Sequence, residues 1–362
     1  MQFRQEHGPE VEIDELGLPD RYRVSALIGR GGMGLVYQAV DNDLGLPVAI
    51  KILHGELCGT SESRQRFLRE ARALAGLQHN NIVRIRQLGL SNHGRPFQVI
   101  ELLQGETLGQ KLAANGALSL ADFRSIFSQI ADALAYASAK NIVHRDLKPS
   151  NIFLCQVNQG DEVKVRAVLL DFGIAKIVES EDCEKTISNK KILVGSPPYM
   201  SPEQCRGEAV DLRSDIYSLG CVMYESLTGL PPFLGETAVD VMYQHMNAEA
   251  MPLQSVTASG DAGSSLLCDF VIRCLNKDPL KRPQAFSEFT TALSEAITGA
   301  PAARFVVKAA GKSNRRAQRL SLFVWLLTGA LILLACLASL NHKQRSKIML
   351  PIQTSASADN FE

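Results

Sequence analysis

The sequence predicts an α+β protein with a small β-rich N-terminal lobe, a larger helical lobe and one C-terminal transmembrane helix. Three observations support this prediction. Short runs of β type cluster before residue 104, whereas the spacing of apolar residues becomes helical beyond about residue 200. An uncharged stretch of 21 residues, 320–340, follows a polar linker. The length of 362 residues suffices for a two-lobed core with appended segments.

Composition is that of a globular protein, but the charge is unevenly distributed. Hydrophobic residues make up 46% of the chain and charged residues 21%, with a net charge of zero. Residues 300–362 carry nine Lys or Arg against two acidic residues, whereas residues 1–299 carry 29 basic and 36 acidic groups. A basic nucleic-acid-binding surface is therefore not indicated. The eight cysteines form no C-x-x-C pair, which favours reduced thiols over a zinc or redox site.

The predicted N-terminal lobe follows the polar residues 1–20, where we expect little order and no cleaved signal peptide. Runs of β type flank a group of glycines between residues 22 and 40. Apolar residues at helical spacing predict a helix over 63–77. The other expected strands of this lobe are 47–53, 82–88 and 96–103.

The predicted helical lobe begins with an amphipathic helix over 119–139. Ser119 is its expected N-cap, and Asp122 occupies its third position. Residues 158–161 read Asn-Gln-Gly-Asp, which predicts the turn of a long β-hairpin. Short strands are expected over 142–144, 152–157 and 163–170.

A glycine-rich turn lies in the first lobe. Residues 29–34 read Gly-Arg-Gly-Gly-Met-Gly, which fits G-x-G-x-x-G. Glycines let the backbone approach a triphosphate and point N–H groups at it. Dinucleotide-binding folds use the same pattern, but here a strand rather than a helix follows. The sequence therefore favours a β-hairpin lid over phosphates.

Lys51 ends the run Val-Ala-Ile-Lys, 17 residues after Gly34. A lysine on a buried strand requires partners, because an unpaired buried ammonium is costly. Phosphates and a carboxylate from the next helix would supply them. Glu70 is the expected carboxylate, and the alternative is that Glu70 is a solvated surface residue.

The most informative window reads His-Arg-Asp-Leu-Lys-Pro-Ser-Asn over residues 144–151, with Asp-Phe-Gly beginning twenty residues later at Asp171. It contains a candidate base, Asp146, and a lysine, Lys148. It also contains two oxygen donors suited to Mg²⁺, Asn151 and Asp171.

Together these motifs resemble the eukaryotic-type protein serine/threonine kinase family, in particular its bacterial membrane-anchored branch. The resemblance covers about residues 21–295 and implies the two-lobed protein kinase fold. It implies that Asp146 accepts the proton of the substrate hydroxyl, and that Lys148 balances the γ-phosphate charge. It also implies that Asn151 and Asp171 hold Mg²⁺.

The resemblance further implies ATP and Mg²⁺ as cofactors, with Mn²⁺ as an alternative metal. Lys51 would grip the α- and β-phosphates and pair with Glu70. Ile100 falls at the gatekeeper position before the hinge that holds adenine. The implied ATP-binding residues are Ile28, Gly29, Arg30, Gly31, Gly32, Met33, Gly34, Leu35, Val36, Ala49, Lys51, Glu70, Glu101 and Leu103.

Further matches lie downstream. Residues 195–203 resemble the segment that closes the activation loop, with Ser201 where the family often has alanine. Asp215 resembles the aspartate that braces the catalytic loop. Arg282 matches the arginine that pairs with Glu203.

The loop over 174–194 is the expected site of control. In the family, an arginine such as Arg145 commonly awaits a phosphate on this loop. Thr186 and Ser188 are the candidate autophosphorylation sites. Ser196 instead matches a threonine that contacts the catalytic residues.

The uncharged stretch 320–340 predicts a membrane span, because a helix of this length at ~1.5 Å per residue crosses a ~30 Å hydrocarbon core. Six basic residues in 300–319 against three in 341–362 place the kinase lobes in the cytoplasm. We therefore expect a single-pass protein of the cytoplasmic membrane. The expected parts are an extension (1–20), an N-lobe with hinge (21–103), a C-lobe (104–295), a basic linker (296–319), the span (320–340) and an extracytoplasmic tail (341–362).

The predicted function is transfer of the ATP γ-phosphate to Ser or Thr hydroxyls of proteins. Expected partners are protein substrates, the membrane and a second copy of the chain, without nucleic acid. A pseudokinase scaffold is the alternative, and it predicts loss of Lys51, Asp146, Asn151 or Asp171, all of which are present. A receptor with a folded ectodomain is a second alternative, but the 22 residues after Leu340 are too few to fold alone.

Overall fold

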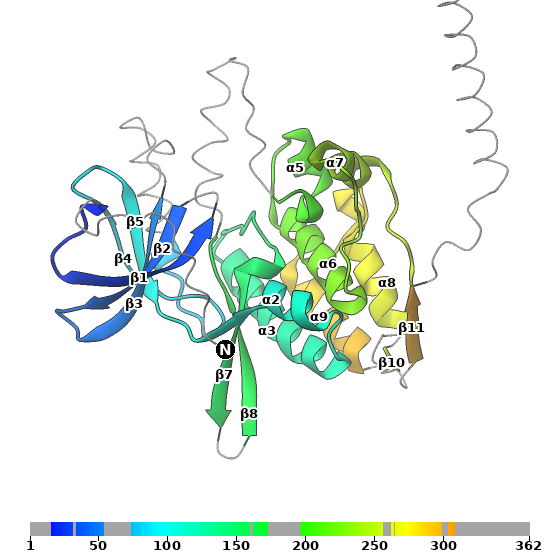
Figure 1. Ribbon diagram of the computed structural model, residues 1–362. Coiled ribbons are helices and arrows are strands. Elements are labelled where there is room, and N and C mark those ends of the chain that lie inside the picture. The colour runs from blue at the N-terminus through cyan, green and yellow to red at the C-terminus, as the bar shows by residue number, and fades with distance from the viewer. Residues whose placement is uncertain are drawn as a thin grey trace, which may run out of the picture. The chain divides into compact units, whose positions relative to one another are not determined.

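The computed structural model describes residues 16–31, 34–53, 74–159, 162–172, 196–255, 262–263, 265–298 and 303–307. The chain divides into two compact units, Met1–Lys308 and Ala309–Glu362, and every described residue belongs to the first. Within that unit a β-rich lobe precedes a mainly helical lobe (Figure 1), as predicted.

The N-terminal lobe is built on a five-stranded antiparallel sheet with the order β1-β2-β3-β5-β4. Its strands are β1 (Tyr22–Gly31), β2 (Gly34–Asp41), β3 (Leu46–Leu53), β4 (Ile85–Leu90) and β5 (Pro96–Glu101). The expected strand over 82–88 thus begins three residues later, because Ile82 instead bridges Leu169 of the other lobe. Of the helix expected over 63–77, only the end from Leu74 is described.

The two faces of this sheet differ. One face buries a core that includes Tyr37, Ile50 and Phe97. Because side chains alternate along a strand, Lys51 lies on the opposite face, between Val36 of β2 and Gln98 of β5. Ala49 and Ile100 form the next cross-strand row on that face.

The C-terminal lobe packs helices around α6 (Leu212–Thr228), most of whose residues are buried. The predicted helix over 119–139 is α3 (Leu120–Ser138), and the Ser119 hydroxyl caps it by accepting the Asp122 N–H at 3.1 Å. The other helices are α2 (Leu108–Asn115), α5 (Pro202–Arg206), α7 (Ala238–Asn247), α8 (Ser265–Cys274) and α9 (Phe286–Thr298).

Two small sheets complete the lobe. The predicted long hairpin is present as β7 (Ile152–Gln159) and β8 (Glu162–Leu169), with Gln159 opposite Glu162, and β6 (Gly105–Thr107) pairs with β7. The other sheet contains β9 (Leu253–Ser255), β10 (Ala262–Gly263) and β11 (Ala303–Val307), which the helical periodicity beyond residue 200 did not predict.

The prediction of a strand over 142–144 was wrong. These residues form an irregular segment, because the backbone N–H of His144 donates to the carboxylate of Asp215 instead of to a neighbouring strand. As for the membrane, no helix in the described part of the chain is both long and apolar enough to span it. The predicted span over 320–340 lies outside that part.

Candidate active site

The segment between α3 and the 3₁₀ turn η3 (Pro149–Asn151) carries the candidate base. Asp146 is only 7% exposed. Its Oδ2 lies 2.8 Å from Nζ of Lys148 and accepts a hydrogen bond from Nδ2 of Asn151 at 3.1 Å. The same Asn151 nitrogen donates to the Asp146 carbonyl at 2.8 Å. Two donors thus converge on one carboxylate oxygen and fix the orientation of this side chain.

Asp215, at the start of α6, holds the backbone of this segment. Its buried carboxylate accepts the N–H groups of His144 at 2.6 Å and of Arg145 at 2.8 Å. Bonds to a charged acceptor are stronger than neutral ones. They help to offset the φ of 65° at Arg145, a left-handed conformation that is costly for a residue with a side chain.

Lys51 and Asp171 come from different lobes and form an ion pair, with Nζ of Lys51 2.8 Å from Oδ1 of Asp171. Lys51 is buried, so its ammonium requires a carboxylate, and Asp171 supplies one. Glu70, the expected partner of Lys51, lies outside the described residues. Gln98 also donates to Oδ1 of Asp171, at 3.5 Å. Gln98 could not be identified from the sequence, because its position beside Lys51 depends on the register between β3 and β5.

The glycine-rich turn is the predicted hairpin, with Gly31 opposite Gly34. A Cβ on Gly34 would lie 2.1 Å from the carbonyl oxygen of Ile52, so close packing against β3 requires glycine there. A Cβ on Gly31 would meet no described atom within 4 Å, so this position leaves room for a ligand.

The remaining predicted residues of the turn follow the same register. Gly29 pairs with Val36, and Arg30 pairs with Leu35. Ile28 lies at an irregularity of β1 and is 41% exposed. Gly32 and Met33 lie outside the described residues.

The hinge begins where β5 ends. The Glu101 carboxylate accepts the N–H of Arg84 at 3.2 Å, and the Glu101 N–H donates to the Arg84 carbonyl at 3.1 Å, so this residue is held on both sides of its own peptide. Leu103 and Ile100 pack against the apolar cluster that also receives Phe153 of β7. Phe153 was missed by sequence reasoning, because an apolar residue in a strand cannot be told from a core residue by its pattern.

The donor set at Asn151 and Asp171 fits a Mg²⁺ ion. The Asn151 nitrogen is committed to Asp146, which leaves the amide oxygen for a cation. The Asp171 side chain is 32% exposed and offers a second hard oxygen donor. Mg²⁺ prefers such oxygens and binds through one or two protein groups together with phosphates.

The turn η4 (Pro197–Tyr199) and the residue before it lie beside the candidate base, since Ser196, Tyr199 and Asp146 line one small cavity. The Lys148 ammonium donates to the Ser196 hydroxyl at 3.2 Å, a contact expected from the resemblance. The Tyr199 hydroxyl donates to Glu225 of α6 at 2.7 Å, which ties the turn to the central helix. Gly173 and the candidate phosphosites Thr186 and Ser188 lie outside the described residues.

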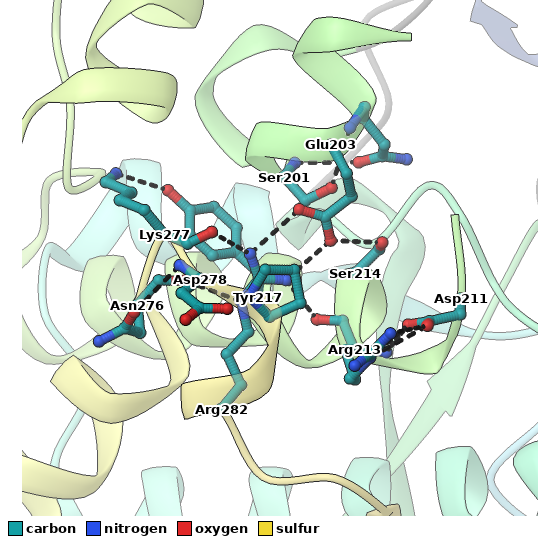
Figure 2. Close-up of polar contacts among 12 residues, drawn as sticks. Ser201, Glu203, Asp211, Arg213, Ser214, Tyr217, Asn276, Lys277, Asp278 and Arg282 are labelled. Atoms are coloured by element: carbon teal, nitrogen blue, oxygen red, sulfur yellow. Dashed lines mark hydrogen bonds and ion pairs between the residues drawn. The ribbon is translucent and has the colours of Figure 1, made fainter. Parts of the chain in front are cut away.

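Glu203 and Arg282 form a buried bidentate ion pair between α5 and the turn η5 (Pro279–Lys281) (Figure 2), with distances of 2.7 and 3.0 Å. The Ser214 hydroxyl donates to Glu203 at 2.6 Å. Burial alone would raise the pKa of Glu203, but the hydrogen bonds from Arg282 and Ser214 outweigh it and lower the pKa below its ordinary value.

All five N–H groups of Arg282 donate hydrogen bonds. Its other N–H groups donate to the carbonyls of Arg213, Asn276 and Lys277, and its guanidinium lies 4.8 Å from the centre of the Tyr217 ring. Figure 2 shows these groups gathered around Arg282. The pair therefore anchors α5, the helix that follows η4.

The sequence matches the family model "Protein kinase domain" over residues 22–293. It is 39% identical over 287 residues to the probable serine/threonine-protein kinase PknB of Bifidobacterium longum, covering 77% of this chain and 40% of the relative. It is 36% identical over 287 residues to the serine/threonine-protein kinase PknB of Mycobacterium tuberculosis, covering 78% of this chain and 44% of the relative.

Comparison with solved structures also finds a protein kinase domain. The PknI kinase domain of Mycobacterium tuberculosis superposes with a TM-score of 0.57 at 26% identity, over 77% of this chain and 98% of that structure. The chain therefore covers less than half the length of these two PknB relatives, but nearly all of a solved kinase domain.

Proposed function

The chain belongs to the protein kinase domain family, and from this premise we propose that it transfers the γ-phosphate of ATP to Ser or Thr hydroxyls of proteins. The observation that carries the proposal is the geometry around Asp146, whose carboxylate is oriented by Lys148 and Asn151. Lys148 also donates to Ser196, so this carboxylate lies beside the turn η4, which we propose as the substrate turn. The names of the curated relatives support the Ser/Thr specificity.

The residues divide the chemistry among themselves. Asp146 would accept the proton of the attacking hydroxyl, while Lys148 stays close enough to balance negative charge at the transferred group. Lys51 would bind phosphate oxygens of ATP. Mg²⁺, when held by Asn151 and Asp171, would supply neutralisation of phosphate charge.

The test compares two carboxylates. Asp146→Asn should reduce phosphoryl transfer at least about a hundredfold and leave the Kd for ATP nearly unchanged, because the base acts on the hydroxyl. Asp171→Asn should weaken Mg²⁺·ATP binding as well as transfer. Transfer is measured with radiolabelled ATP and a protein acceptor, and binding by calorimetry. Retained transfer in purified Asp146→Asn would refute the assignment and favour a pseudokinase scaffold.

The protein is further proposed to be anchored in the cytoplasmic membrane by residues 320–340. The support is the uncharged length of this stretch and the six basic residues in 300–319, which lack acidic neighbours. Each basic group contributes ~1 kcal/mol near an anionic leaflet. The proposed parts are the kinase lobes over 21–103 and 104–295, followed by the linker, the span and the tail.

Autophosphorylation of the loop over 174–194 is the proposed control, with Thr186 or Ser188 as the acceptor. The support is the position of Arg145 beside Asp146, since an arginine there can pair with a loop phosphate. Mass spectrometry should find phosphate in this loop of the wild-type protein and none in Asp146→Asn. An active enzyme without any phosphate on the loop would contradict this control.

A further inference from the structure

Gln204 connects α5 to the backbone of the catalytic segment. Its Nε2 donates to the carbonyl oxygen of Arg145 at 2.9 Å, across 59 residues of sequence. Gln204 and Asp146 also line one small cavity, together with Ser196. Gln204 is not among the residues proposed to bind ATP, Mg²⁺ or the substrate hydroxyl.

A capping box orients the Gln204 side chain. Its Oε1 accepts the N–H of Ser201 at 3.0 Å, and the Ser201 hydroxyl accepts the Gln204 N–H at 3.3 Å. Ser201 is fully buried and lies beside Glu203 (Figure 2). With the amide oxygen held by Ser201, the amide nitrogen is directed to Arg145. The Ser201 hydroxyl supplies the other bond of the capping box, to the backbone of Gln204.

The carbonyl that Gln204 binds belongs to the peptide that joins Arg145 to Asp146. The N–H of the same peptide, on Asp146, donates to Nδ1 of His144 at 3.3 Å. Both polar groups of one peptide plane are thus engaged. This plane contains the N–Cα bond of Asp146, so its orientation, together with the φ and χ1 of Asp146, sets where the carboxylate points.

We propose that Gln204 is a positioning residue that orients the catalytic base of the proposed kinase reaction through the Arg145 carbonyl. It does not touch the substrate. It transmits the placement of α5, which directly follows the substrate turn, to the peptide before Asp146. The inference rests on the proposed kinase activity.

Gln204→Glu is the sharpest test. Glutamate is the usual partner of serine in a capping box and keeps the oxygen that Ser201 needs, but its carboxylate cannot donate to Arg145. The full-length chain in detergent, with casein as acceptor, should show kcat reduced about tenfold, with the KM for ATP and the thermal midpoint near wild type. Gln204→Met is the second variant, for use if Gln204→Glu folds poorly. It lacks the amide donor, so its kcat should fall by a similar factor.

Two controls separate positioning from general stability. Gln110→Glu is the same change in the capping box of α2, where the exposed Gln110 amide accepts from Thr107 and reaches no catalytic residue among its described contacts. It should leave kcat unchanged. The thermal midpoint of each variant is the second control, because a merely structural role would lower kcat and the thermal midpoint together.

The outcomes are distinct. An inactive wild-type protein would overturn both the proposed function and this inference. An active wild type with normal kcat in Gln204→Glu and Gln204→Met would overturn the positioning role alone. A kcat loss equal in Gln204→Glu and Gln110→Glu, or one that follows the loss of thermal midpoint, would also overturn it.

Discussion

Glu203 and Arg282 show how much one pair of side chains can contribute here. The two residues are 5% and 1% exposed, so each charge depends on the other. Arg282→Met should lower the free energy of unfolding by about 3–5 kcal/mol, because it leaves a buried carboxylate without its partner. Denaturant unfolding of the purified protein measures this change.

A matched control lies at the C-terminal end of α5. Arg206 and Glu208 form an exposed pair at 3.8 Å, and Arg206→Met should cost less than about 1 kcal/mol. The double variant Glu203→Gln with Arg282→Met should recover part of the loss, since it removes the unpaired charge. Equal effects of Arg282→Met and Arg206→Met would contradict the argument.

The same pair predicts a pH dependence. Because the pKa of Glu203 is lowered in the folded state, the pair contributes stability at pH values above the ordinary carboxyl pKa. This contribution should disappear as the pH falls through the folded pKa. Wild-type stability should therefore fall more steeply than that of Glu203→Gln below about pH 4 in denaturant titrations.

Single residues also show what sequence could and could not predict. The types and spacing of Asp146, Lys148 and Asn151 predicted a converging cluster, because all three lie within six residues. Gln204 could be read as the end of a capping box, but its contact with Arg145 depends on a fold that joins distant segments. The ion pair of Lys51 with Asp171 likewise joins distant segments, while the expected partner Glu70 lies outside the described residues.

Among the elements, the β7–β8 hairpin is longer than its packing requires. Its inner residues pack against the hinge, as Cys155 does in the cluster with Leu103. Its outer half extends away from the helices (Figure 1), and Val157 and Val163 there are 41% and 62% exposed. Periodicity and turn residues predicted this hairpin because both signals are local.

The outer half should be dispensable. Replacing residues 157–164 by Asn-Gly would join Gln156 to Val165, which already face each other, through a two-residue turn. We expect kcat to stay within about twofold and the unfolding free energy within about 1 kcal/mol, because surface changes away from packed features are small. A large loss of activity would show that the tip takes part in catalysis.

One predicted element, the strand over 142–144, is absent from the structure. Its β-branched residues fit the pattern of a strand, but Asp215 takes the hydrogen bond that a neighbouring strand would need. Tertiary contacts of this kind override local propensity. Functional segments are where such conflicts are expected.

At the scale of the whole molecule, the anchor is the main proposal to test. Deleting residues 320–362 should release an active kinase into the soluble fraction, whereas deleting only 341–362 should leave it in the membrane. Fractionation with activity measurements distinguishes the two. Protease added to intact cells should spare the lobes if they are cytoplasmic, and their digestion from outside would refute the orientation.

The two glycines at the ends of the β1–β2 turn separate folding from ligand binding within one motif. Gly34 is required by the Ile52 carbonyl, whereas Gly31 borders open space in the described part of the chain. In a library of substitutions scored for cellular abundance and for activity, position 34 would fail both scores. Position 31 would keep abundance and lose activity. Two glycines of the same motif would thus be required for different reasons, one for folding and the other for ligand binding.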